Sequence, residues 1–348
     1  MKNIIESNIK ALGSLSLKEY MSLVLYHPLY GYYSKKNIIG NPGDFITAPE
    51  ISQTFGELIA NWIILNSKSL MKKDFNYAEL GPGKGTLSQD IFRTIKKLDI
   101  KLYKKINNIF FLEKSNSFIN LLQAKFDKAI IIKDIIELKK KSTIIIANEF
   151  FDALPVNQYV YKNNFWYEKR IVLENNNLTF QLASKPTMKK FFFPEHAKDG
   201  DVYEYSEYSN YTVSNICKFM KKHNGALILI DYAKRINDTN GTLAAIHRHK
   251  HVSPFYMPGQ VDLSVRPDFD LIKKIALLEK CKVFGPISQG SFLVNLGINE
   301  RIKQLIKQNP ELKNKLDSQR DRLINKDYMG ENFKVLIITQ KNLRGGIF

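Results

Sequence analysis

The chain has 348 residues, of which 44% are hydrophobic and 12% aromatic, as in an ordinary folded protein with one large core or two smaller ones. Its net charge of +18 would suit a nucleic-acid-binding protein, but the lysines are spread along the whole length, which favours a solvated basic surface. Two cysteines, Cys217 and Cys281, are too few for a disulfide framework or a metal site, and they suit a reducing compartment.

The N-terminal residues favour a cytoplasmic bacterial protein. They lack the apolar core of a signal peptide and the arginines of a transit peptide, since the first arginine is Arg93. No apolar run approaches the length of a membrane span, so none is expected.

The first 70 residues are expected to be mainly helical. Residues 3–26 carry apolar side chains at helical spacing, and Ser16-x-x-Glu19 predicts a capping box that starts a second helix. A turn is expected at residues 40–43. Thr47-x-x-Glu50 reads as another capping box, opening a helix that continues through Trp62. Glu50 is therefore interpreted either as a capping residue or as a catalytic one.

A short apolar run begins at residue 75 and leads to an acidic residue, Glu79. Three glycines follow at alternate positions, Gly81, Gly83 and Gly85. A helix pattern follows, with Thr86-x-x-Gln89 as its expected cap. Glycines suit a tight turn whose backbone approaches a ligand, and the start of a helix presents unpaired N–H groups there. This stretch predicts a cofactor-binding edge, although a glycine-rich turn without a ligand would have the same pattern.

The spacing of the glycines separates three cofactor classes. A dinucleotide fingerprint has the spacing G-x-G-x-x-G, and here the third glycine comes one residue early. A P-loop needs Gly-Lys followed by Ser or Thr, whereas Lys84 is followed by Gly85. The remaining pattern, acidic-x-G-x-G-x-G, is the first motif of class I methyltransferases that use S-adenosylmethionine. Glu79 is then placed to act on the ammonium group of that donor.

Polar residues also follow the next three predicted strands. Residues 108–112 end in Glu113, the position at which such folds bind ribose hydroxyls. Residues 129–132 end near Asp134, which either accepts a hydrogen bond from the adenine amino group or is a solvated strand-end residue. Residues 143–147 are wholly apolar, as a buried parallel strand should be, and they lead into Asn148.

The second half of the chain predicts an antiparallel insertion and then the rest of the sheet. Strands are expected within 158–182, at 226–230, near 281–284 and at 334–339, and helices at 206–222 and 298–325. Residues 232–270 are expected to be mostly irregular. Their alternating histidines, His247 to His251, favour a basic loop over a metal site, because no other ligand cluster accompanies them.

The predicted fold is α/β, a Rossmann-like, mostly parallel sheet of the class I methyltransferase type, with a helical N-terminal extension and a small antiparallel insertion. Four segments are expected. Residues 1–70 form an N-terminal helical extension, residues 71–157 the donor-binding half of the core, and residues 158–205 the insertion. Residues 206–348 form the remainder of the core, with an acceptor-side loop (232–270) and a helical insertion (298–325).

Several phrases together resemble one known family, the MidA-type methyltransferases, whose members include a mitochondrial arginine methyltransferase that assists assembly of respiratory complex I. The matching phrases span nearly the entire chain, at residues 43–56, 79–86, 148–155, 231–232, 258–263, 289–293 and 329–334. The resemblance implies a class I fold, S-adenosylmethionine as donor and a protein arginine as acceptor, with a complex I subunit as the expected partner. Three departures, Ala233, Gly241 before Thr242, and Arg266, all lie within 232–270.

Carboxylates near the donor are the expected means of binding a guanidinium. Glu149 and Asp152 follow the fourth core strand, where class I methyltransferases place acceptor-side residues, and are the predicted guanidinium clamp, with Glu50 as the third candidate. Asn148 is expected to contact the donor or to hold the loop. From position alone, Glu149 and Asp152 would equally suit the capping of a turn.

Two other functions remain open from the sequence. One is a methyltransferase for a nucleic acid or a small molecule, because an Asn followed by aromatic residues superficially resembles the loop that grips base amino groups. Another is a cofactor-binding assembly chaperone without turnover. The sequence does not indicate the target arginine, the degree or symmetry of methylation, or the oligomeric state.

Overall fold

The computed structural model describes residues 1–34, 46–71, 73–188, 193–234, 238–248 and 250–343. The chain forms two compact units, each built from several segments. The N-terminal unit contains Met1–Phe45, Asp152–Tyr211 and Lys234–Leu271, and the core unit contains Ile46–Phe151, Thr212–Ala233 and Ile272–Phe348. The four-segment division expected in chain order stays a prediction. The turn expected at residues 40–43 lies outside the described residues.

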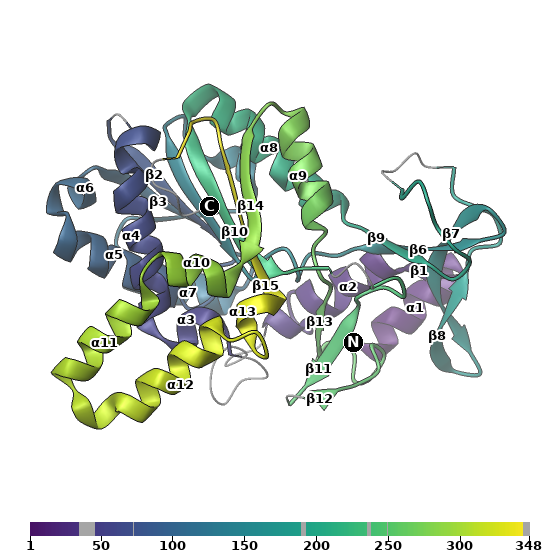
Figure 1. The fold of residues 1–348 in the computed structure, drawn as a ribbon. Helices are drawn as coiled ribbons and strands as arrows, with labels where there is room; N and C mark the ends of the chain where they lie inside the picture. Colours follow the sequence, from purple (N-terminus) through teal and green to yellow (C-terminus); the bar gives the residue numbers. More distant parts are fainter. Residues whose placement is uncertain (35–45, 72, 189–192, 235–237, 249, 344–348) are drawn as a thin grey trace. The chain divides into compact units, whose positions relative to one another are not determined.

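A seven-stranded sheet forms the centre of the core unit (Figure 1). Its strand order is β14-β15-β10-β5-β2-β3-β4, with β10, β5, β2, β3 and β4 parallel and β15 antiparallel to both of its neighbours. This arrangement confirms the predicted α/β class with a mostly parallel sheet. The strands are β2 (Phe75–Leu80), β3 (Ile106–Leu112), β4 (Ala129–Ile132), β5 (Thr143–Asn148), β10 (Gly225–Tyr232), β14 (Lys282–Ser288) and β15 (Phe333–Thr339).

The two central strands were recognisable from the sequence because they are covered on both faces. Every residue of β2 and of β5 is buried, and both strands are mainly apolar, with the polar residues Asn76 and Glu79 in β2 and Thr143 and Asn148 at the ends of β5. Leu80 pairs with Ala147 and with Leu112, so β2, β3 and β5 end at nearly the same level of the sheet. The residues that follow these strands therefore meet at one edge, which we call the carboxyl edge.

Helices cover the sheet of the core unit. Helix α4 packs against α5, and Phe55, Ile59 and Ile91 join the strand residues in one apolar core. Helices α8 (Glu207–His223) and α9 (Phe269–Leu278) each include residues of both units. The other helices of the core unit are α3 (Ala48–Ile51), α4 (Gln53–Leu70), α5 (Thr86–Leu98), α6 (Ile100–Lys104), α7 (Asn116–Lys125), η2 (Ile135–Glu137), α10 (Gln289–Asn295), α11 (Ile298–Gln308), η3 (Pro310–Leu312), α12 (Lys313–Ile324) and α13 (Met329–Asn332).

Two predicted helix caps in the core unit were wrong. Thr47 makes no side-chain cap hydrogen bond, and the helix it was expected to open is interrupted at Ser52, whose extended backbone (φ −155°) separates α3 from α4. The Ser52 hydroxyl caps α4 by accepting from the Thr54 N–H. The N-cap of α5 is Gly85, without a side-chain bond, and Thr86 is already the first helical residue.

The N-terminal unit contains the predicted antiparallel insertion. Its strands pair in the order β1-β7-β6-β9, with β8 on β7. Apolar residues of the first two helices, including Ile5, Leu17 and Met21, pack with Ile171 of β7 in a separate core. The elements are α1 (Lys2–Leu12), β1 (Leu15–Ser16), α2 (Leu17–Tyr26), η1 (Tyr32–Ser34), β6 (Asn157–Lys162), β7 (Phe165–Glu174), β8 (Asn177–Leu182) and β9 (Val202–Tyr205).

Most of the described residues within 232–270 are irregular, as expected, but this segment also contains three short strands that were not predicted. Three short strands, β11 (Ala244–His247), β12 (Lys250–His251) and β13 (Asp262–Ser264), form a small antiparallel sheet in the order β12-β11-β13. Their lengths of two to four residues leave too little alternation for a period to be read from the sequence.

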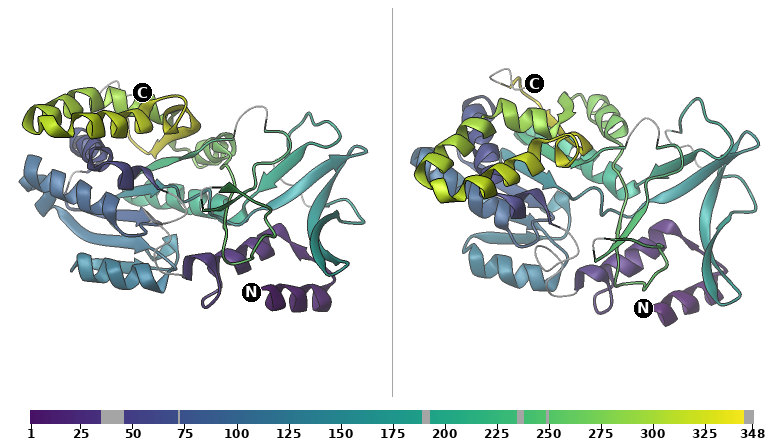
Figure 2. Two further views of the ribbon diagram at one scale, coloured as in Figure 1. Left: turned by 90° about the horizontal axis from the view of Figure 1, so that it is seen from below. Right: turned by 60° about the horizontal axis from the view of Figure 1, so that its bottom comes forward.

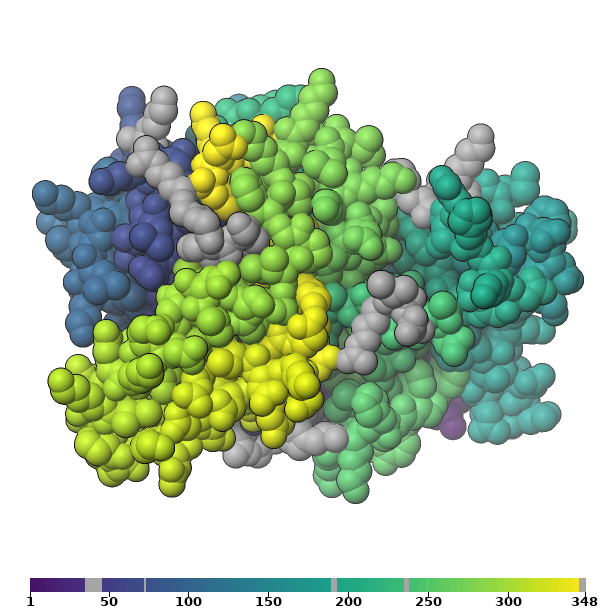
Figure 3. Space-filling model, viewed as in Figure 1, coloured from purple at the N-terminus to yellow at the C-terminus, as the bar shows by residue number. Residues whose placement is uncertain are grey.

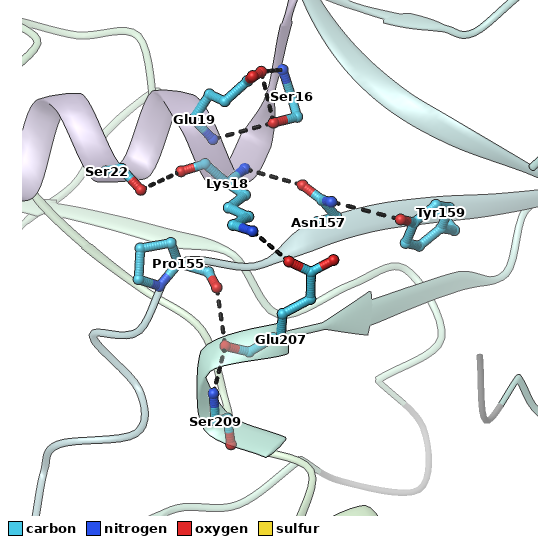
Figure 4. Close-up of polar contacts among 10 residues, drawn as sticks. Ser16, Lys18, Glu19, Ser22, Pro155, Asn157, Tyr159, Glu207 and Ser209 are labelled. Atoms are coloured by element: carbon cyan, nitrogen blue, oxygen red, sulfur yellow. Dashed lines mark hydrogen bonds and ion pairs between the residues drawn. The ribbon is translucent and has the colours of Figure 1, made fainter. Parts of the chain in front are cut away.

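Polar contacts join α2 to the insertion within the N-terminal unit (Figure 4). Ser16 and Glu19 form the predicted capping box, in which the Ser16 hydroxyl accepts from the Glu19 N–H at 3.1 Å. The Lys18 N–H donates to the Asn157 side chain at 3.3 Å, and the Lys18 ammonium pairs with Glu207.

A helix long and apolar enough to cross a membrane is absent from the described part of the chain.

Candidate active site

The glycine turn after β2 has the backbone conformation that its sequence predicted. Gly81, Gly83 and Gly85 have φ values of 66°, 52° and 73°, all in the left-handed region that favours glycine. A Cβ on Gly81 would lie 3.0 Å from the Phe150 ring, and one on Gly85 would lie 2.8 Å from both Leu122 and Phe126. Glycine is therefore required here both by backbone conformation and by close packing.

Glu113 follows β3 and lies beside this turn, while its predicted contact with ribose hydroxyls stays a prediction. Its carboxylate accepts hydrogen bonds from the N–H groups of Lys114 and Ser115, each at 2.8 Å, and from the N–H of Gly83. Burial raises the pKa of Glu113, and these backbone bonds oppose the rise. The carboxylate thus links the end of β3 to the middle of the glycine turn.

Glu79 is buried within the core unit, with 3% of its surface exposed. Its carboxylate accepts hydrogen bonds from the Ser88 hydroxyl of α5 and, at 3.1 Å, from the Tyr77 hydroxyl of its own strand. Burial raises the pKa of Glu79 to about 7, while the bonds from Ser88 and Tyr77 act in the opposite direction. A carboxyl group with this pKa changes its charge near neutral pH, so a nearby cation would decide its ionisation.

Asp134 follows β4 and caps the short helix η2. Its side chain accepts from the Ile136 N–H at 3.1 Å, and Glu137 accepts from the Asp134 N–H at 2.9 Å to complete a capping box. Asp134 also attracts the Lys114 ammonium. The structure gives Asp134 a local structural role, and its contact with an adenine amino group stays a prediction.

Asn148 and Glu149 end β5 at the carboxyl edge. The side-chain Oδ1 of Asn148 is buried and has no hydrogen-bond partner, while its Nδ2 donates to the Glu149 carboxylate at 3.3 Å. A buried acceptor without a donor costs about 1–3 kcal/mol, which a ligand N–H group would offset. Glu149 itself has a φ of 51°, which is uncommon for a residue other than glycine and is found preferentially at functional sites.

The Glu149 carboxylate also explains the start of α3. It accepts from the Ala48 N–H at 3.1 Å, and therefore takes the capping role that the sequence assigned to Thr47. The Glu149 N–H donates to the Ile230 carbonyl of β10 at 2.9 Å. Both contacts hold this carboxylate in place at the end of the sheet.

Glu50 contacts the glycine turn instead of capping its own helix. One carboxylate oxygen accepts from the Thr86 hydroxyl, and the other lies 3.9 Å from the Lys84 ammonium. Helix α3 therefore joins two parts of the site, because its Glu50 side chain contacts the glycine turn and the N–H of its first residue, Ala48, donates to Glu149. These contacts were not predicted from the sequence, since the partners lie far apart along the chain.

Asp152 belongs to the N-terminal unit, whereas Glu149 and Glu50 belong to the core unit. Its carbonyl accepts from the Val265 N–H at 2.9 Å. Its negative charge, together with burial and the nearer Asp262, raises the pKa of Tyr33, whose hydroxyl lies 3.4 Å from Asp262. The predicted clamp of Glu149 and Asp152 stays a prediction.

Asp231 is a further residue of the site that the sequence marked only as a family match. It is fully buried at the end of β10, and its carboxylate accepts from the N–H groups of Phe151 and Tyr232 at 2.9 and 2.8 Å. It thereby fixes the loop that follows Glu149. Among the described residues, no group of three His, Cys, Asp or Glu side chains is arranged to hold a metal ion.

Comparisons with known proteins agree with this geometry. A family model described as "Putative S-adenosyl-L-methionine-dependent methyltransferase" matches residues 58–287. The mitochondrial protein arginine methyltransferase NDUFAF7 of Danio rerio is 30% identical over 357 residues, covering 94% of this chain and 84% of that protein. The NDUFAF7 protein of Homo sapiens is 30% identical over 369 residues, covering 97% and 83%.

The fold is also found in a crystal structure from Burkholderia thailandensis, a candidate methyl transferase bound to S-adenosyl-homocysteine. It matches with a TM-score of 0.82 at 22% identity, covering 97% of this chain and 91% of that one. The family model covers well over half of the chain, and the relatives cover nearly all of it. The chain therefore belongs to the MidA-type family of S-adenosylmethionine-dependent methyltransferases, and S-adenosylmethionine is its methyl donor.

Proposed function

We propose that this protein is a protein arginine N-methyltransferase whose acceptor is a subunit of respiratory complex I. The arginine acceptor is supported by relatives that are named protein arginine methyltransferases. The complex I subunit is supported by the resemblance of the sequence phrases to the MidA-type family. A cytoplasmic location is part of the proposal, and two free, buried cysteines suit it.

The donor site in this proposal is the edge formed by the glycine turn, Glu113 and Asn148. The turn brings backbone close to the ligand, Glu113 accepts from the ribose hydroxyls, and the unpartnered Asn148 Oδ1 accepts from an N–H group. Glu79 supplies a negative charge for the ammonium group, and Asp134 accepts from the adenine amino group. S-adenosylmethionine supplies an activated methyl group on a sulfonium sulfur.

The observation that carries the arginine proposal is the position of Glu149. A guanidinium is a poor nucleophile because it is cationic and delocalised, and it must approach the positively charged donor. A fixed carboxylate binds it, offsets the second positive charge and localises electron density on the attacking nitrogen. Glu149 is held for this role by its bonds to Ala48 and Ile230, and its left-handed backbone shows that the loop is tightly constrained.

Asp152 and Glu50 complete the proposed acceptor side. Asp152 is the other carboxylate that the sequence predicts for the clamp, and a carboxylate also receives the proton that the methylated nitrogen releases. Glu50 is in contact with Lys84 and Thr86, so its contribution is to position the turn against the acceptor-side residues.

The test uses subunits of complex I from cells that lack this protein, incubated with purified protein and methyl-labelled S-adenosylmethionine. Mass spectrometry should detect a methylated arginine with the wild-type protein. Glu149→Gln should lower the rate about a hundredfold or more. The variant should still bind S-adenosyl-homocysteine, because the amide oxygen can accept from the Ala48 N–H as the carboxylate does.

Glu300→Gln is the matched control, because it removes an exposed carboxylate on α11. It should have wild-type activity. Full activity of Glu149→Gln would remove Glu149 from the mechanism. If the wild-type protein binds S-adenosyl-homocysteine but transfers no methyl group to arginine, the protein arginine methyltransferase proposal is wrong, and a chaperone role without turnover is favoured.

A further inference from the structure

The core unit has a pocket of about 320 Å³ of which the proposed chemistry uses one lining residue, Glu50. It lies between α3 with the start of α4 on one side and the α11–α12 pair on the other, and we call it the α3–α12 pocket. Figure 2 shows α11 and α12 lying side by side, and Figure 3 shows both helices at the surface. Its volume is at the lower end of the range for ligand sites.

We infer that the α3–α12 pocket binds a short extended segment of the acceptor protein next to the target arginine, and that it takes an apolar side chain of that segment. The inference rests on the proposed function, since it names how the same enzyme selects its acceptor. It adds a specificity site to the donor and guanidinium sites.

The first support is the position of the helices in the chain. Helices α11 and α12 lie between β14 and β15 in the chain. Ser288, at the end of β14, pairs with Lys334 of β15, and Phe333, at the start of β15, pairs with Tyr232 at the end of β10. The segment therefore leaves and re-enters the sheet at the carboxyl edge. Acceptors must reach this edge, because ligands of open α/β sheets bind outside the carboxyl ends of the strands.

The second support is that the pocket shares α3 with the candidate active site. Glu50 lines the pocket and also accepts from Thr86 at the glycine turn. The first residue of the same helix, Ala48, donates to Glu149. A peptide seated on α3 would thus lie next to both the donor turn and the proposed guanidinium ligand.

The third support is the chemistry of the lining. Apolar side chains from both walls, Pro49, Ile51, Leu305, Leu312 and Leu316, suit one apolar side chain. The amide side chains of Gln53, Asn309 and Gln319 both donate and accept hydrogen bonds, as a peptide backbone requires. With one lysine and one glutamate, the lining lacks the cluster of cations that phosphate groups need.

The walls are also held in a fixed arrangement. Arg301 of α11 binds the Glu57 carboxylate of α4 through two nitrogens, at 2.7 and 3.2 Å, and Leu305 one turn later is buried in the core. When a pocket is already formed before the ligand binds, less binding free energy is lost in ordering its side chains.

The test compares acceptor kinetics of Leu312→Glu with those of Leu121→Glu. Leu312 is 40% exposed and Leu121, on α7, is 36% exposed, so both variants place a charge at a similar surface leucine of the core unit. The substrate is the complex I subunit that the wild-type protein methylates. A three-residue peptide centred on its target arginine, too short to reach the pocket, is the second substrate.

For Leu312→Glu, the KM for the protein acceptor should rise about tenfold, because an apolar contact is lost and a charge is introduced. The kcat at saturation, the affinity for S-adenosyl-homocysteine and the kinetics with the three-residue peptide should match the wild type. Leu121→Glu should match it throughout.

A wild-type KM for the protein acceptor in Leu312→Glu would overturn the inference while leaving the proposed function intact. A loss of S-adenosyl-homocysteine affinity, or an equal effect on the three-residue peptide, would also overturn it, because the substitution would then act on the active site itself. No methylation by the wild-type protein would instead refute the proposed function, and the inference would fail with it.

Discussion

Glu79→Gln tests whether the buried carboxylate of β2 meets the positive charge of the methyl donor. Glu79 is 3% exposed, and burial raises its pKa from an ordinary value of 4.5 to about 7. Glutamine has nearly the same shape and keeps an oxygen that can accept from Ser88 and Tyr77. The substitution therefore removes the charge with little change in packing.

The pKa of Glu79 makes the stability of the ligand-free protein fall as pH rises. Because the pKa in the folded state is above that in the unfolded state, the folded protein binds the proton more tightly, and the free energy of unfolding falls between pH values of about 4.5 and about 7. At about 1.4 kcal/mol per pKa unit, the whole loss is about 3 kcal/mol, of which about 2 kcal/mol falls between pH values of about 5.5 and about 8.

Urea denaturation of the wild-type protein and of Glu79→Gln at both pH values measures this loss. The difference in unfolding free energy between the two proteins should move by about 2 kcal/mol in favour of the variant as pH rises, since contributions from other titrating groups cancel. A difference that does not change with pH would contradict the assigned pKa.

Ligand binding then tests the contact itself. If the ammonium group of the ligand requires ionised Glu79, its affinity follows the ionised fraction of that carboxyl group. This fraction is about one tenth at one pH unit below the pKa and about nine-tenths at one pH unit above it. The affinity for S-adenosyl-homocysteine, measured by calorimetry, should therefore rise about tenfold between pH values of about 6 and about 8 in the wild type. If Glu79→Gln shows the same rise, Glu79 does not meet the donor.

Two further substitutions test the backbone at the carboxyl edge. Gly81→Ala should lower the unfolding free energy by about 1–2 kcal/mol because of its φ of 66°, and should weaken S-adenosyl-homocysteine binding at least tenfold, about the effect of 1.4 kcal/mol. Gly13→Ala, with a φ of 81° and no atom within 4 Å of the added Cβ, should have only the stability effect, so equal affinities in the two variants would refute the proposed approach of the turn to the donor. Asp231→Asn should lower the unfolding free energy by about 1–3 kcal/mol, because its carboxylate accepts from the buried Phe151 N–H and from the Tyr232 N–H through different oxygens, and an amide has a single oxygen. An unchanged thermal unfolding midpoint would contradict that role.

The sheet was predictable because its buried strands are mainly apolar, and this pattern can be recognised within each strand's own sequence. The strand at Thr143–Asn148 is buried on both faces, so the continuous apolar pattern of its residues 144–147 sufficed to predict it. The glycine turn was predictable for a similar reason, since the three left-handed φ values leave glycine as the favoured residue.

The caps show where local patterns fail. Ser16 and Glu19 form their predicted box, in which each side chain accepts from the backbone N–H of the other residue. Thr47 and Glu50 have the same spacing, yet the N–H of Ala48 meets Glu149, which is 101 positions away, and Glu50 meets Thr86. A pattern of four residues cannot contain such partners, because the sheet brings them together only after folding. The same limit applies to Ser88, which is nine positions from Glu79 and meets it only because α5 packs on the sheet.

The antiparallel last strand has a consequence for how this family diversifies. Because Ser288 and Lys334 are paired neighbours, the chain between them begins and ends at one place on the sheet. The exposed parts of these helices can vary in length without altering the register of the strands, whereas Arg301 and Leu305 tie the buried face to α4 and the core. If this segment selects the acceptor, as we infer, substitutions confined to its exposed side chains should change the choice of target and leave the left-handed backbone of the glycine turn as it is.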